Sequence, residues 1–177
     1  MDVPMPTATG EIHVFTFKEG VLSRVAHDLR LSLERFRVTI DADALSATFE
    51  TTSLRVDGII RKGELDRHEL DAAQRQEIEH TVRTRILDTR TYPLARLEAR
   101  TARVGPVLEV RGELELLGQR RGVTFSARAE GGDFVADVEL VPSRWGIRPY
   151  AAMLGTIRLA DRVRIVARLR AQDPAGS

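Results

Sequence analysis

The sequence predicts a mainly β protein, with about eight antiparallel strands and one α-helix between the third and the fourth strand. Apolar and polar residues alternate along most of the chain, and this period of two is typical of half-buried strands. Turn signals such as Gly105–Pro106 and Gly131–Gly132 separate the alternating segments. Because one face of each strand is apolar, the sheet must close on itself or stack on a second sheet. A barrel capped or flanked by the single helix is the economical solution.

Three strands are predicted before the helix, at Glu11–Phe17, Leu29–Asp41 and Leu45–Val56. In the second of these, the apolar residues change from odd to even positions at Glu34–Arg35. Such a change turns the apolar residues to the other face of the sheet, and it therefore indicates a bulge or a sharp bend. The third segment also shifts phase before Leu54.

One segment, Asp66–Leu87, has the period of a helix instead. Its apolar residues recur at multiples of four, at Leu70, Ile78, Val82 and Ile86. Asp66 is positioned to cap the start of this helix, with Glu69 three residues later completing a capping box. Tyr92–Pro93 prevents the helix from continuing.

Five further strands are predicted after the helix, at Leu94–Val104, Val107–Leu117, Val123–Ala129, Phe134–Val141 and Thr156–Leu169. Gly118–Gly122 is predicted as a loop between two of them. Between the seventh and the eighth strand lies an aromatic corner that contains Trp145 and Tyr150, interrupted by Gly146 and Pro149. Such a corner suits the rim of a barrel, either at the mouth of a cavity or as a plug of packed side chains.

The composition fits a single domain over residues 1–177, with flexible ends at residues 1–10 and 171–177. The chain has no cysteine, which excludes disulfides, cysteine-ligated metal sites and thiol nucleophiles. Its four histidines are scattered, and neither a metal nor a cofactor is predicted.

The charge balance and the N-terminus limit the partners and the location. With a net charge of +1 and no basic stripe, nucleic acid is not an expected partner. No segment has the length of a membrane span. The first residues contain no signal peptide, which predicts a cytoplasmic protein.

Several segments, in this order along the chain, resemble the YceI-like family. They are Val25–Leu31 (VAHDLRL), Thr51–Val56 (TTSLRV), Ile86–Pro93 (ILDTRTYP), Val110–Arg121 (VRGELELLGQRR) and Ser143–Ile147 (SRWGI). The chain departs from the family at Asp66–Leu70, where DRHEL stands in place of the Arg-Asp-x-His-Leu run that many members carry. The resemblance implies an extended lipocalin-like barrel that binds polyisoprenoids or similar amphiphiles, and a possible homodimer.

Small residues at inward positions bear on whether the barrel is hollow. Ala47, Gly112, Ala127 and Ala136 either leave space inside or sit opposite large residues, and the pattern does not separate these two interpretations. If a cavity exists, its expected ligand-binding residues are Phe15, Phe17, His27, Leu29, Phe36, Phe49, Val110, Leu114, Phe125, Phe134, Trp145 and Tyr150.

Three residues are candidates for contact with a polar head group: His27, Arg144 and Arg148. His27 is also the only candidate for catalysis, as an acid or base beside Asp28. Neighbours along a strand point to opposite faces, however, so this pair needs another partner. A structural hydrogen bond is the third role open to His27.

These observations favour a binding protein that carries an elongated apolar or amphiphilic molecule, such as an isoprenoid or another lipid-like chain. An enzyme that uses His27 on a small apolar substrate in the same cavity is an alternative, and the less favoured one. A ligand-free structural or dimerisation module is the third hypothesis.

Overall fold

The computed structural model describes residues 7–19, 27–152 and 157–172. This part of the chain forms twelve β-strands and one α-helix. The strands before the helix are β1 (Ala8–Lys18), β2 (Asp28–Leu33), β3 (Phe36–Asp41), β4 (Ala44–Glu50), β5 (Leu54–Arg61) and β6 (Glu64–Asp66). The helix is α1 (Ala72–Thr81). The strands after it are β7 (Leu94–Val104), β8 (Val107–Leu116), β9 (Gln119–Glu130), β10 (Asp133–Leu140), β11 (Ala151–Ala152) and β12 (Ile157–Ala171).

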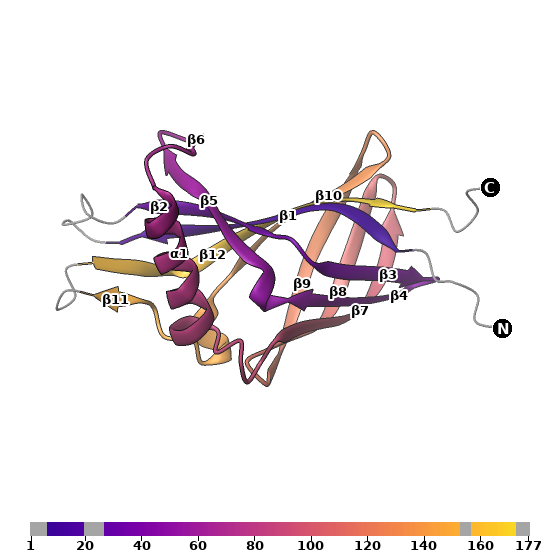
Figure 1. Ribbon diagram of the computed structural model, residues 1–177. Coiled ribbons are helices and arrows are strands. Elements are labelled where there is room, and N and C mark those ends of the chain that lie inside the picture. Colours follow the sequence, from indigo (N-terminus) through magenta and orange to yellow (C-terminus); the bar gives the residue numbers. More distant parts are fainter. Residues whose placement is uncertain (1–6, 20–26, 153–156, 173–177) are drawn as a thin grey trace.

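The strands form one antiparallel sheet in the order β3-β4-β7-β8-β9-β10-β12-β1-β2-β5-β6, and β11 pairs with β12. The sheet curls into a partial barrel, elongated along β1 and β12 (Figure 1). Its β3 edge comes back to the start of β1, where Thr7 and Thr39 form an isolated antiparallel bridge. The prediction of a mainly β fold built on an antiparallel sheet is therefore confirmed, but the sheet forms a half-barrel (Figure 1) and not the closed barrel that was expected.

Two predicted strands are each divided by a break, which corrects the predicted number of strands. The change of phase at Glu34–Arg35 separates β2 from β3, and a 3₁₀ turn, η1 (Thr51–Ser53), separates β4 from β5. The buried Ser53 hydroxyl accepts a hydrogen bond from the Arg35 amide (2.9 Å) and donates one to the Glu50 carbonyl (2.8 Å). These two divisions and the short strands β6 and β11 give twelve strands instead of about eight.

The helix begins later than predicted. Asp71, and not Asp66, caps it: the Asp71 carboxylate accepts a hydrogen bond from the Gln74 amide, and the Gln74 side chain accepts one from the Asp71 amide. Asp66 ends β6 and accepts hydrogen bonds from the amides of His68 and Glu69 in the bend that follows. Glu64–Asp66 pairs with β5 and is therefore a strand. With the two divided strands counted separately, six strands precede the helix instead of three. Its last turn widens into the π-helical segment η2 (Val82–Ile86).

Several strand ends also differ from the prediction. β9 begins at Gln119, so the predicted loop Gly118–Gly122 is a tight turn at Leu117–Gly118, where both residues have positive φ (51° and 70°). β1 begins at Ala8 and β12 ends at Ala171, so parts of the predicted flexible ends belong to strands. The rest of those ends, residues 1–6 and 173–177, lies outside the described residues.

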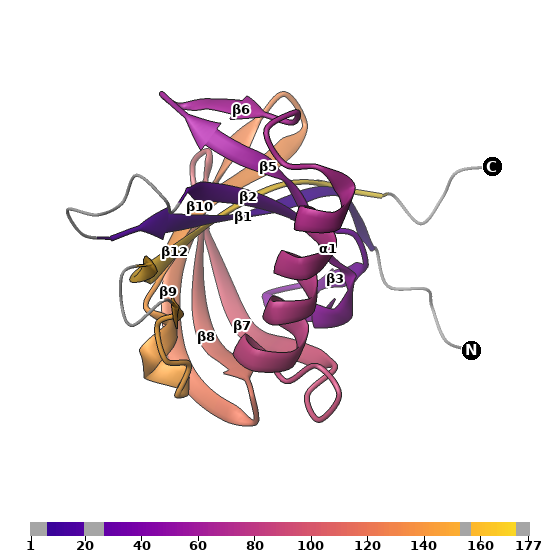
Figure 2. The ribbon, with the colours of Figure 1, turned by 60° about the vertical axis from the view of Figure 1, so that its left-hand side comes forward.

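The helix lies along the open side of the curled sheet, beside β5 (Figure 2). A cluster of buried side chains on the inner face of the sheet joins β3, β4 and β7–β9 to the corner after β10. Its members are Val38, Leu45, Ala47, Leu97, Val110, Val123 and Trp145. None of the helices in the described residues is long and apolar enough to cross a bilayer.

Candidate ligand-binding cavity

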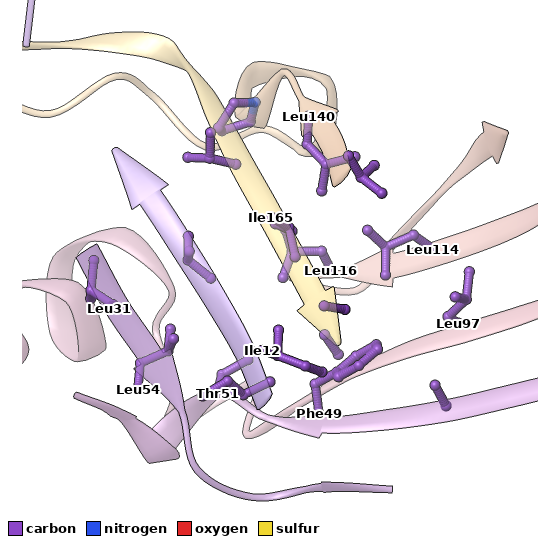
Figure 3. A pocket seen from close by; sticks show the side chains of 18 of the residues that line it. Ile12, Leu31, Phe49, Thr51, Leu54, Leu97, Leu114, Leu116, Leu140 and Ile165 are labelled. Carbon is purple, nitrogen blue, oxygen red and sulfur yellow. The ribbon is translucent and has the colours of Figure 1, made fainter. Parts of the chain in front are cut away.

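A cavity of about 600 Å³ lies between the inner face of the sheet and α1. This volume is within the range of small-molecule binding sites in proteins. The walls are almost entirely Leu, Ile, Val, Ala and Phe side chains. Figure 3 shows Ile12, Leu97, Leu114 and Ile165, from four different strands, directed into the same space.

The cavity is elongated. Along β1 it is lined at one end by Ala8, then by Ile12 and Val14, and at the other end by Thr16. The eight residue-to-residue steps from Ala8 to Thr16 span about 27 Å. A cavity of about 600 Å³ extended over such a length is narrow, and it suits a flexible chain better than a compact, globular molecule.

A row of alanines provides the space in the middle of the wall. Ala136 of β10 pairs with Ala127 of β9 on one side and with Ala167 of β12 on the other, and all three line the cavity. Ala47 also lines it. Of the small residues predicted to face inward, these three (Ala47, Ala127 and Ala136) therefore border open space.

Gly112 has a different role from the alanines. A Cβ atom at this position would lie 2.1 Å from the Glu98 carbonyl oxygen and 2.6 Å from the Ala99 Cβ. Since Gly112 pairs with Ala99, only glycine allows β7 and β8 to approach this closely.

Most of the side chains predicted to bind a ligand do line the cavity. They are His27, Leu29, Phe49, Val110, Leu114, Phe125, Phe134, Trp145 and Tyr150. Phe36 does not; it packs against the core cluster from the edge strand β3.

Phe15 and Phe17 also lie outside the cavity, which corrects the predicted site. The alternation along β1 was identified, but Ile12, Val14 and Thr16 form the inward face. The two phenylalanines lie on the outer face under arginines of β12: the Arg164 guanidinium carbon is 5.7 Å from the centre of the Phe15 ring, and that of Arg162 is 4.1 Å from Phe17. Aliphatic stems and cation–π contacts from arginine can cover aromatic rings on a solvated face.

The prediction missed the contribution of the helical segment and one polar residue of β1. Ile78, Val82 and Ile86 line the cavity, although their spacing predicted only the apolar face of a helix. Glu77 is the one carboxylate among the described lining residues, and it is exposed. Thr16 could have been found from its parity with Ile12 and Val14.

His27 lines the cavity, whereas the carboxylate of its neighbour Asp28 is bonded elsewhere. The Asp28 carboxylate accepts a hydrogen bond from the Lys18 amide (2.7 Å). Within the described part of the chain, no hydrogen bond joins the His27 imidazole to a carboxylate or a hydroxyl. The same residues contain no group of three or more His, Cys, Asp or Glu that could hold a metal ion.

The aromatic corner is both packed and part of the cavity wall. Trp145 is 1% exposed, and its indole N–H donates to the Leu114 carbonyl at 2.9 Å. Gly146 ends the short 3₁₀ turn η3 (Pro142–Trp145) with φ at 79°, a conformation that favours glycine. Trp145 is therefore packed, as the plug interpretation predicts, and it also lines the cavity.

Neither Arg144 nor Arg148 of the corner lines the cavity. Arg144 lies over the Trp145 ring, 5.2 Å from its centre, and donates to the Gly122 carbonyl. Arg148 is exposed and does not line the cavity. Among the described lining residues there is no Lys or Arg at all, so the predicted receptor for a phosphate or a carboxylate is not found there.

Comparison with known proteins finds one matching family and several solved structures with a similar fold. A family model described as YceI-like domain matches residues 7–171. No curated protein matches the chain.

Three solved structures resemble it. Burkholderia cenocepacia BcnA has 16% identity and a TM-score of 0.60, with 90% of this chain and 94% of that chain covered. A polyisoprenoid binding domain from Saccharophagus degradans, implicated in plant cell wall breakdown, has 10% identity and a TM-score of 0.62, covering 96% and 100%. A Campylobacter jejuni YCEI protein has 12% identity and a TM-score of 0.58, covering 81% and 84%. At these identities the likeness establishes the fold.

Proposed function

The chain belongs to the YceI-like family, and from this premise we propose that its cavity binds an elongated apolar or amphiphilic molecule, an isoprenoid or another lipid-like chain. The observation that carries the proposal is the long, almost wholly apolar cavity between the sheet and α1. The Saccharophagus degradans neighbour, described as a polyisoprenoid binding domain, supports the same class of ligand.

The affinity would come from burial of the chain. Each methylene removed from water contributes about 0.8 kcal/mol, so ten of them contribute about 8 kcal/mol. That figure corresponds to roughly micromolar binding, and the cost of ordering the ligand reduces it. A chain longer than ten carbons is therefore the better fit to the cavity.

The two alternatives have less support. A filled structural module does not need the open space beside Ala127, Ala136 and Ala167. An enzyme with His27 as acid or base needs a second catalytic group, and the described residues give His27 no hydrogen-bonded partner of that kind.

Native mass spectrometry and solvent extraction of the purified protein test for a ligand directly. We expect a co-purifying apolar molecule, or uptake of an added one such as farnesol, in a one-to-one complex. Protein that neither carries nor takes up any apolar molecule would contradict the proposal.

A cavity-filling variant tests where the ligand binds. Ala136→Leu places a larger side chain in the middle of the alanine row. We expect it to raise the Kd of the dye 1-N-phenylnaphthylamine, and the Kd of farnesol measured by displacement of the dye, at least about tenfold. Val135→Leu is the matched control because its side chain lies on the opposite face of the same strand. Equal losses in the two variants would place the binding site elsewhere.

A further inference from the structure

Thr16 carries a buried polar atom on the wall of the apolar cavity. The Thr16 hydroxyl oxygen is buried and makes no hydrogen bond, although Thr16 lines the cavity. A buried polar group left unsatisfied costs about 1–3 kcal/mol. Such groups are rare in folded proteins, and each one calls for a specific explanation.

Two further polar side chains line the same end of the cavity. His27 precedes β2, in which Leu29 pairs with Thr16. Tyr150 is joined to β12 by the hydrogen bond from the Leu159 amide to the Tyr150 carbonyl, and Leu159 in turn pairs with Lys18, two residues beyond Thr16. Figure 1 shows these ends of β1, β2 and β12 side by side.

The side chains of His27 and Tyr150 are available for binding. Neither makes a hydrogen bond with another described residue through its ring nitrogens or its hydroxyl. Together with Thr16 they offer both donors and acceptors, because a neutral imidazole and a hydroxyl can each donate one hydrogen bond and accept at least one. The opposite end, at Ala8 and Ala171, is apolar.

The charges around the cavity disfavour an anion. The described lining residues contain no Lys or Arg, while Glu77 adds a carboxylate on the side of α1. Moving a phosphate or a carboxylate out of water without a cation to pair with it is costly. A hydroxyl, a carbonyl or an amide needs only hydrogen bonds.

We propose that Thr16, with His27 and Tyr150, forms a polar subsite that receives an uncharged, hydrogen-bonding head group, so that the protein selects a neutral amphiphile such as a long-chain alcohol over the hydrocarbon and over the phosphate of the same chain. This inference rests on the proposed function, since it assigns the orientation and the head-group class of the ligand in the same cavity.

Three farnesyl compounds with one chain and different heads test the selection: farnesol, farnesene and farnesyl phosphate, each displacing 1-N-phenylnaphthylamine. For the unmodified protein we expect farnesol to bind about three- to tenfold more tightly than farnesene, the gain of one or two neutral hydrogen bonds. Farnesyl phosphate is expected to bind more weakly than farnesene. Equal affinities for farnesol and farnesene, or a preference for the phosphate, would overturn the proposal.

Thr16→Val removes the hydroxyl and keeps the shape and the β-branching of the side chain. We expect farnesol to fall to the affinity of farnesene, with farnesene itself unchanged within about twofold. The thermal midpoint of the free protein should stay the same or rise, because an unpaired polar atom has been removed. A large fall in that midpoint would mean that the hydroxyl has a structural partner, and would overturn the assignment.

Thr51→Val is the matched control. Thr51 also lines the cavity, but its hydroxyl is already bonded to the Tyr92 and Pro93 carbonyl oxygens, both at 3.0 Å. This variant is expected to lower the thermal midpoint and to leave the ratio of farnesol to farnesene affinity unchanged. If that ratio fell equally in both threonine variants, the polar subsite would be wrong. If no farnesyl compound displaced the dye, the proposed function itself would fail.

Discussion

At the scale of single residues, Trp145 fixes the corner after β10 through its buried ring and one hydrogen bond. Its indole is buried, lines the cavity and donates to the Leu114 carbonyl in β8. The side chain therefore ties the chain after β10 to a strand that lies two places away in the sheet. Arg144 covers the outer side of the ring.

A substitution at Trp145 tests how much this side chain stabilises the fold. Trp145→Phe loses the hydrogen bond to Leu114 and leaves a small void, and we expect it to lower the free energy of unfolding by about 1–3 kcal/mol. Urea unfolding followed by circular dichroism measures this change, because Trp145 is the only tryptophan of the chain. Tyr92→Phe alters an exposed aromatic residue and should change the stability by less than about 0.5 kcal/mol. Similar values for both variants would contradict the structural role of the indole.

Residue patterns predicted which side chains share a face, but not always which face is the inner one. The alternation in the sequence puts His13, Phe15 and Phe17 on one face of β1 and Ile12 and Val14 on the other, and in the structure only Ile12 and Val14 line the cavity. Aromatic rings then suggested an inner position for Phe15 and Phe17, and this was wrong because Arg162 and Arg164 cover them on the outer face. The arginines come from β12, far along the chain, so local sequence does not contain this information.

At the scale of elements, the outer face of β10 and β12 is held by a ladder of ion pairs. Arg170 and Arg168 both reach Asp133, at 2.7 Å and 3.2 Å, and Arg164 donates to Asp137 at 2.7 Å. The hydrogen bond from Arg170 is the main cause that lowers the pKa of Asp133, and the one from Arg164 lowers the pKa of Asp137. Both carboxylates are therefore more easily ionised in the folded chain than in the unfolded chain.

The lowered pKa values predict how these pairs respond to acid. A carboxylate with a lowered pKa stabilises the fold at a pH above its unfolded value of about 3.9, and this contribution is lost as the pH falls through the folded pKa. We expect the thermal midpoint to drop more steeply below about pH 4 in the unmodified protein than in the Asp133→Asn/Asp137→Asn double variant. The pairs are partly exposed, so the difference should also shrink in high salt. Parallel curves for the two proteins would show that the ladder does not stabilise the fold.

Element boundaries were predicted where the signal is local and missed where it is not. β7 has the predicted bounds, because alternation and the flanking Pro93 and Gly105–Pro106 fix both ends. The breaks at residues 34–35 and 51–53 were detected only as changes of phase. Their form depends on Ser53 bonding to Arg35, 18 residues away.

At the scale of the whole molecule, the open cavity is the feature that the sequence left undecided. Small residues on separate strands predict space only if the register brings them together, and here β9, β10 and β12 do so at Ala127, Ala136 and Ala167. The position of α1 adds the last wall. Both depend on pairing between distant segments, which the period of any one segment does not specify.

A cavity that the folded chain forms and the unfolded chain lacks must couple ligand binding to stability. A ligand that binds only the folded state at a hundred times its Kd stabilises that state by about 2.7 kcal/mol. For a domain of this size, each kcal/mol moves the thermal midpoint by about 2–4 °C. We therefore expect ligand-stripped protein to melt about 5–10 °C higher when farnesol is added at that excess.

The same measurement on Ala136→Leu separates binding in the cavity from adsorption at the surface. The larger side chain raises the Kd, so the same farnesol concentration should give a clearly smaller shift, while Val135→Leu should respond like the unmodified protein. A shift of equal size in all three proteins would show that farnesol stabilises the fold from outside the cavity. A shift confined to the proteins with the open alanine row would instead link the stability of the whole barrel to the molecule inside it.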